Sequence, residues 1–166
     1  MIYLEDFPVG VRRRLGSKVV VEDEVIRFAR EFDPQPFHID KEAAAKGFYG
    51  GVIASGWHTC GMVMRIMVDA YLHESAALGS PGIDELRWIK PVRPGDALTV
   101  YSTVESVTHS KSKPDRGILA SLTEVENQAG EIVLTMRGKT MMLKRAAQAP
   151  TASAAGSTTS GPDGSA

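Results

Sequence analysis

Residues 57–72 read Trp-His-Thr-Cys-Gly-Met-Val-Met-Arg-Ile-Met-Val-Asp-Ala-Tyr-Leu, and they constrain the architecture more than any other segment. On a helix, their apolar side chains recur on nearly every side, which is typical of a helix inside a hydrophobic core. The segment is too short to span a bilayer, and His58, Arg65 and Asp69 interrupt it. We therefore expect one long buried helix with the rest of the chain folded around it.

Strand patterns surround this helix. One β-like segment, residues 15–21, precedes it, and four segments with β-branched or alternating residues follow it. The four are residues 83–89, 97–107, 117–126 and 132–143. This order predicts a single α+β domain in which an antiparallel sheet of about five strands wraps around the helix. The exposed edges of such a sheet invite pairing with a second copy.

An amphipathic helix over residues 21–32 leads to the segment Asp33-Pro-Gln-Pro-Phe-His38. Pro34 disfavours helical geometry at Asp33, so the helix should end there. In a continuous helix Asp33 and His38 would lie about 140° apart around the axis. We expect the two prolines to impose a stiff, extended turn that aims both side chains into one pocket. The helix dipole should raise the Asp33 pKa, giving a general acid–base pair in outline.

Composition and net charge narrow the possible classes of function and partner. The chain has 166 residues, 43% hydrophobic and 23% charged, with a net charge of −1 and a pI near 6.4. A nucleic-acid partner therefore has no overall electrostatic support. The single cysteine, Cys60, excludes an intramolecular disulfide, and with no secretory signal pattern we expect a cytoplasmic protein. Residues 146–166 hold no large apolar side chain, which predicts a disordered tail after a folded unit over residues 1–145.

Three blocks in order resemble the MaoC-like acyl dehydratases, the (R)-specific enoyl-CoA hydratase group of the hot-dog superfamily. Residues 33–40, Asp-Pro-Gln-Pro-Phe-His-Ile-Asp, are similar to the Asp-x-Asn-Pro-x-His-x-Asp signature of that family. Residues 51–56, Gly-Val-Ile-Ala-Ser-Gly, look like its glycine turn into the central helix. Residues 87–96, Arg-Trp-Ile-Lys-Pro-Val-Arg-Pro-Gly-Asp, resemble the strand and turn that follow. The resemblance covers nearly all of residues 1–145.

The resemblance implies a hot-dog fold and reversible addition of water to a trans-2-enoyl-CoA thioester. It implies that Asp33 and His38 are the catalytic pair and that the Gly56 N–H binds the thioester oxygen. Independently, a helix N-terminus at Gly56 would offer unpaired N–H groups to a developing enolate. Which member of the pair carries which proton stays open, because the two groups titrate as a unit.

The chain departs from the family pattern in three ways. Gln35 stands where the signature has Asn, and Ser55 stands where the family usually has His. A histidine follows the glycine instead, at His58, and Met64 replaces a serine found in some members. These departures bear on substrate preference more than on the catalytic pair. Taken alone, Ser55 is expected to cap the following helix.

Further substrate-binding candidates fall into two groups. Those near the motif in sequence are Phe37, Phe48, Tyr49, Ser55, Trp57 and His58. The second group is three cations of one predicted hairpin loop, suited to the phosphates of coenzyme A: Lys111, Lys113 and Arg116. The histidine spacing does not suggest a metal site, and we expect no cofactor beyond coenzyme A as part of the substrate.

The expected partners are the acyl-CoA substrate and a second copy in a homodimer or higher homo-oligomer, with no nucleic acid and no membrane. Two rival functions remain open. A hot-dog thioesterase would hydrolyse acyl-CoA with a carboxylate and the same helix N-terminus. A non-catalytic acyl-CoA-binding subunit would be expected to lack one member of the acid–base pair, whereas this chain has both.

Overall fold

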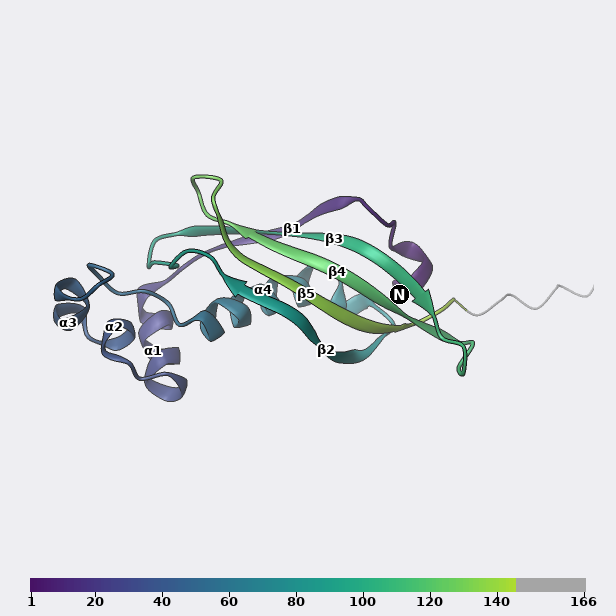
Figure 1. Cartoon of the computed structure of the whole chain (residues 1–166), viewed down its shortest axis with the longest axis horizontal. Coiled ribbons are helices and arrows are strands. Elements are labelled where there is room, and N and C mark those ends of the chain that lie inside the picture. The colour runs from purple at the N-terminus through teal and green to yellow at the C-terminus, as the bar shows by residue number, and fades with distance from the viewer. Residues whose placement is uncertain (146–166) are drawn as a thin grey trace, which may run out of the picture.

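The computed structural model describes residues 1–145, so the tail predicted over residues 146–166 lies outside the described residues. A five-stranded antiparallel sheet forms one layer (Figure 1). Its strands are β1 (Arg12–Val19), β2 (Ala77–Trp88), β3 (Ala97–His109), β4 (Arg116–Glu126) and β5 (Ile132–Leu143). Their spatial order is β1-β3-β4-β5-β2, which leaves β1 and β2 at the edges. The predicted α+β class and the five antiparallel strands are confirmed.

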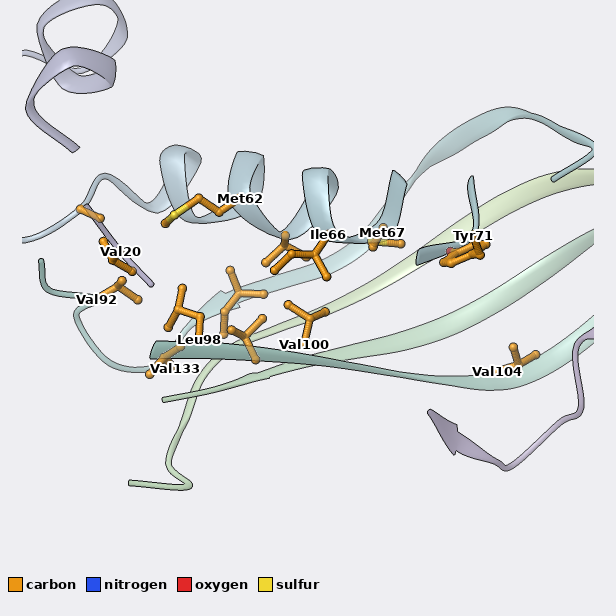
Figure 2. Close-up of a cluster of buried hydrophobic side chains, with 14 of the residues drawn as sticks. Val20, Met62, Ile66, Met67, Tyr71, Val92, Leu98, Val100, Val104 and Val133 are labelled. Carbon is orange, nitrogen blue, oxygen red and sulfur yellow. The ribbon is translucent and has the colours of Figure 1, made fainter. Parts of the chain in front are cut away.

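Helix α4 (Gly56–Ala70) lies against the sheet and supplies one side of the hydrophobic core. Figure 2 shows Met62 and Ile66 of α4 facing Leu98 and Val100 of β3. At Gly16 of β1, an added Cβ would lie 3.1 Å from Ile66 Cγ2, so this glycine allows the close approach of strand and helix. Burial of these apolar side chains is the main favourable contribution to folding.

The expectation that α4 is buried on every side is wrong for one face. Trp57 and Met64 are 61% and 49% exposed, and Arg65 and Asp69 form an exposed ion pair with a 2.8 Å contact. A single sheet covers only one side of a helix, so the opposite side of α4 is exposed to solvent in a single copy of the chain. The apolar residues on that side explain why periodicity alone predicted complete burial.

Strand β2 begins earlier than the sequence predicts, at Ala77 instead of residue 83. Residues 79–82 read Gly-Ser-Pro-Gly, which is typical of a turn, yet they continue the strand with shifts in register. An edge strand tolerates these residues because one side of its backbone has no ladder to complete.

Three short helices gather at one end of the sheet, beside the N-terminus of α4 (Figure 1). They are α1 (Glu22–Phe32), α2 (Pro36–Ile39) and α3 (Lys41–Lys46). Two 3₁₀ turns, η1 (Leu4–Asp6) and η2 (Leu72–Glu74), complete the described elements. Within residues 1–145 every helix is too short or too polar to cross a membrane.

Helix α1 ends at Phe32, with Asp33 as its C-cap, as Pro34 predicts. The segment that follows is not the extended turn expected from the sequence. Pro36 is the first residue of α2, and His38 lies within that helical turn. Proline is well suited to a first helical position because its fixed φ matches the helix and no N–H is needed there.

Candidate active site

A cleft of about 460 Å³ lies at the N-terminus of α4. Its walls come from α2, from the segment that leads into α4, and from the end of β2 with the loop that follows. The lining residues are Asp33, Gln35, Phe37, His38, Tyr49, Ile53, Ala54, Ser55, Gly56, Trp57, Thr59, Trp88, Ile89, Lys90, Pro91 and Val92. The cleft thus joins all three sequence blocks that are far apart along the chain.

Asp33 and His38 meet in this cleft. His38 Nε2 lies 3.3 Å from Asp33 Oδ2, and the His38 side chain is 5% exposed. The other ring nitrogen, Nδ1, lies 2.7 Å from the carbonyl oxygen of Ile53. A carbonyl oxygen can only accept, so Nδ1 carries a proton and donates it. Nε2 is therefore the ring nitrogen that can exchange a proton with a group in the cleft.

The Asp33 carboxylate accepts hydrogen bonds on both oxygens. Gln35 Nε2 donates to Oδ1 over 2.7 Å, and Ser55 Oγ donates to Oδ2 over 2.7 Å. The Gln35 bond, then the Ser55 bond, lower the Asp33 pKa below its ordinary value despite partial burial, and the charge of His38 adds to this. The raised pKa expected from the helix dipole is wrong, because two direct donors outweigh a dipole that acts over a longer distance.

Ser55 is the N-cap residue of α4, but its side chain makes no capping hydrogen bond. The capping role expected from the sequence is wrong, since the hydroxyl points to Asp33 instead. A serine cap is typically worth about 1 kcal/mol, so α4 begins without a stabilisation that its sequence could supply. The backbone still helps to order this turn, because Thr59 N donates to Ser55 O over 3.0 Å.

Gly56 is the first residue of α4, and its N–H has no acceptor inside the helix. The indole of Trp88 covers the α-carbon of Gly56 so closely that an added Cβ would lie 2.5 Å from Trp88 Cε2. Trp88 also packs edge-on against Trp57, with ring centroids 5.3 Å apart. Trp88 is a cleft residue that the sequence reasoning missed, although it lies in the third family-like block.

The candidates near the motif do not all reach the cleft. Phe37 and Trp57 line it, as expected. Tyr49 lines it too, but Phe48 is wrong as a candidate, because it is 97% exposed and only packs edge-on against Tyr49. Arg93 Nη2 donates to the Tyr49 carbonyl over 2.7 Å, which holds this part of the wall.

His58 faces away from the catalytic pair. Its ring stacks on Phe28 of α1, with centroids 4.9 Å apart, and it lines a separate groove between α1 and α4. Burial lowers the His58 pKa, and its Nδ1 is buried without a hydrogen-bond partner among the described residues. One helical position is about 100° of rotation, which suffices to turn a side chain from one face to another.

The three cations of the hairpin loop, Lys111, Lys113 and Arg116, lie at the end of the sheet opposite to α1–α3 (Figure 1). Arg116 pairs with Asp115, with a 2.7 Å contact. Within one chain these cations do not approach the cleft. The predicted phosphate contact would therefore require a second copy of the chain.

Comparison with known proteins agrees with the three sequence blocks. The family model described as a MaoC like domain matches residues 8–126. The MaoC-like dehydratase from Rhodospirillum rubrum is a similar solved structure, with a TM-score of 0.80 and 43% identity, covering 87% of this chain and 99% of that chain. This likeness confirms the predicted hot-dog fold.

Two relatives in sequence are also similar. YdeM of Bacillus subtilis (strain 168), described as an uncharacterized protein, is 33% identical over 125 residues, which is 75% of this chain and 87% of that protein. The 3-hydroxyacyl-thioester dehydratase Z of Mycobacterium tuberculosis is 28% identical over 129 residues, covering 75% of this chain and 85% of that protein.

Proposed function

The chain belongs to the MaoC-like dehydratase family, and we propose that it is a hydro-lyase that adds water reversibly to a trans-2-enoyl-CoA thioester to give a 3-hydroxyacyl-CoA. The observation that carries this proposal is the 3.3 Å approach of His38 Nε2 to Asp33 Oδ2 in one cleft with Gly56. Such a pair can bind a water molecule and remove its proton beside a helix N-terminus that stabilises negative charge.

The hydrogen bonds of the site favour a specific role for each member of the Asp33–His38 pair. Asp33 receives two hydrogen bonds, so it acts as a carboxylate that orients the attacking water and balances the charge of His38. As the water oxygen bonds to C3, His38 Nε2 takes a proton from that water. The same nitrogen then returns a proton to C2 on the same face, which gives syn addition. Because its pKa is lowered, Asp33 is ionised at neutral pH and has no proton to give to C2.

Gly56 supplies the third element. When water attacks C3, negative charge moves to the thioester oxygen, and an N–H at the start of α4 can stabilise it. The reaction uses proton transfers and a backbone donor, so the proposal calls for no metal or redox cofactor. The thioester class of the substrate is supported by the name of the M. tuberculosis relative, a 3-hydroxyacyl-thioester dehydratase.

A homodimer is part of the proposal. Edge strand β2 presents three large apolar residues with exposures between 42% and 53%: Leu78, Ile83 and Trp88. An exposed apolar edge of this kind favours pairing with a second copy. Light scattering of the purified chain should give the mass of a dimer or a larger assembly. The cytoplasmic location stays a prediction.

The decisive experiment follows the loss of enoyl-CoA absorbance with short, branched and medium acyl chains. Wild type should hydrate at least one of them, and Asp33→Asn and His38→Ala should each lose about 10²–10⁴-fold in kcat. Two matched controls away from the cleft, Asp69→Asn and His109→Ala, should retain activity.

An inactive wild type across the whole acyl panel would refute hydration. Release of free thiol from a saturated acyl-CoA would support the thioesterase instead. Binding of acyl-CoA without either reaction would identify a non-catalytic subunit.

A further inference from the structure

We propose that Ser55 is a positioning residue for this reaction: its hydroxyl holds the Asp33 carboxylate against His38 and leaves the start of α4 uncapped for the thioester oxygen. The inference rests on the proposed function. It concerns a position where this chain departs from the resembled family pattern, with Ser in place of the usual His.

The contacts of Ser55 anchor the Asp33 carboxylate. The residue is fully buried, at 0% exposed, and its Oγ donates to Asp33 Oδ2 over 2.7 Å across 22 positions of the chain. The same carboxylate oxygen lies 3.3 Å from His38 Nε2. The atom that faces the imidazole is therefore also the atom that Ser55 holds.

Asp33 needs such an anchor because its backbone does not lie inside a regular element. It is the C-cap of α1, with φ −151° and ψ 65°. Its second oxygen bonds to Gln35, whose side chain is exposed, so water can compete for that bond. The bond from Ser55 is the better shielded of the two, and a shielded hydrogen bond to a charged group restricts its geometry more strongly.

The same orientation affects α4. Backbone N–H groups in the first helical turn have no partner within the helix. A serine at the N-cap ordinarily accepts one of these N–H bonds, but Ser55 does not. Its hydroxyl is committed to Asp33, so the N–H groups at the start of α4 remain available to a ligand oxygen. The Ser55 side chain thus orients the Asp33 carboxylate and also leaves the helix N-terminus free for the thioester oxygen.

The test compares Ser55→Ala with Ser55→Thr, which keeps a hydroxyl, and with Ser75→Ala as the control. Ser75 is partly buried, and its hydroxyl donates to a backbone oxygen, Leu72 O, outside the cleft. Three quantities are measured on each folded protein: kcat and KM for the best enoyl-CoA, the pH profile of kcat/KM, and the Asp33 titration by carboxyl ¹³C NMR, assigned with Asp33→Asn.

Ser55→Ala should lose about 10- to 100-fold in kcat with little change in KM, because the reacting groups are misplaced while the substrate still binds. Its Asp33 pKa should rise in the NMR titration, since a donor to the carboxylate is lost. Ser55→Thr should recover most of the rate, and Ser75→Ala should match wild type.

A Ser55→Ala enzyme with wild-type kcat and an unchanged Asp33 titration would overturn the inference. An unchanged titration with a lower melting temperature in both Ser55 variants would also overturn it, because Ser55 would then act only in stability. The titration needs no turnover. A shifted Asp33 pKa in an inactive wild-type background would support the hydrogen-bond role while refuting the hydratase function.

Discussion

Trp88 packs directly over Gly56, and an added Cβ at Gly56 would lie 2.5 Å from the indole carbon Cε2. The two residues come from the end of β2 and the start of α4, and together they form the part of the cleft where the thioester oxygen is proposed to bind. The absence of a side chain at residue 56 is therefore a tertiary requirement as well as a helix-start preference.

Gly56→Ala should displace Trp88 and lower kcat/KM by 10²-fold or more, because the oxyanion donor and its cover both shift. Gly61→Ala is the matched control in the same helix, since nothing lies within 4 Å of an added Cβ there. This control should keep activity and gain up to about 1 kcal/mol of stability from helix propensity. Steady-state kinetics and thermal unfolding of both variants check the prediction. Equal activity in the two variants would contradict it.

Gln35→Ala should raise the Asp33 pKa, because the Gln35 hydrogen bond is the largest cause of its lowering. The carboxyl ¹³C titration of Asp33 is the measurement, because the acidic limb of kcat/KM also reports the deprotonation of His38 that the proposed reaction requires. The rate at neutral pH should fall less than in Ser55→Ala, because water can replace an exposed amide. Gln35→Asn, which restores the residue of the resembled signature, is the comparison. A larger loss than in Ser55→Ala would contradict the ranking of the two donors.

His58 should make the stability of the protein depend on pH. Its pKa is lowered in the folded state by burial, so the unfolded chain binds more protons as the pH falls. The contribution is fully present above the unfolded pKa of about 6.5 and is lost as the pH falls toward the folded value.

His58→Phe should flatten this dependence as the pH falls below about 6.5. It should also stabilise the protein by about 1 kcal/mol, because Phe can stack on Phe28 without burying an unpaired ring nitrogen. Urea unfolding at several pH values provides the measurement, with His109→Gln as the exposed control. An unaltered pH dependence would show that His58 is not the responsible group.

A substitution at Leu98 tests the hydrophobic core beneath α4. It is 1% exposed on β3 and faces the helix in Figure 2. Leu98→Ala should cost about 2–5 kcal/mol in the free energy of unfolding, since it removes buried methyl groups and leaves a cavity. Val19→Ala, at a position 58% exposed, should cost within about 1 kcal/mol. Denaturant unfolding of both variants makes the comparison, and similar losses would place Leu98 outside the core.

Local patterns were sufficient for much of the architecture. Pro34 ends α1 at the predicted residue because its ring disfavours helical geometry at the residue before it, which is a local effect. The strands after α4 follow from alternating and β-branched residues, with the main error at residues 79–82, whose turn-like composition is tolerated at a sheet edge. The conformation of residues 33–38 was wrong in detail, because Pro36 starts a helical turn as readily as it extends the chain.

Patterns along the chain were enough to predict α1, the central helix, the strands that follow it, the family, and the presence of Asp33, His38 and Gly56 in family-like blocks. These features depend on neighbours a few residues apart, which propensity and periodicity describe. The contacts between distant residues came only from the folded structure: Ser55 with Asp33 and Trp88 with Gly56 in the cleft, and His58 with Phe28 in the groove between α1 and α4. Each of these contacts joins parts of the chain that are separate in the sequence, and the position of helix α4 in the fold sets the geometry of each contact. The lowered Asp33 pKa has a local cause, the hydrogen bond from Gln35 two residues along the chain, and a tertiary cause, the hydrogen bond from Ser55.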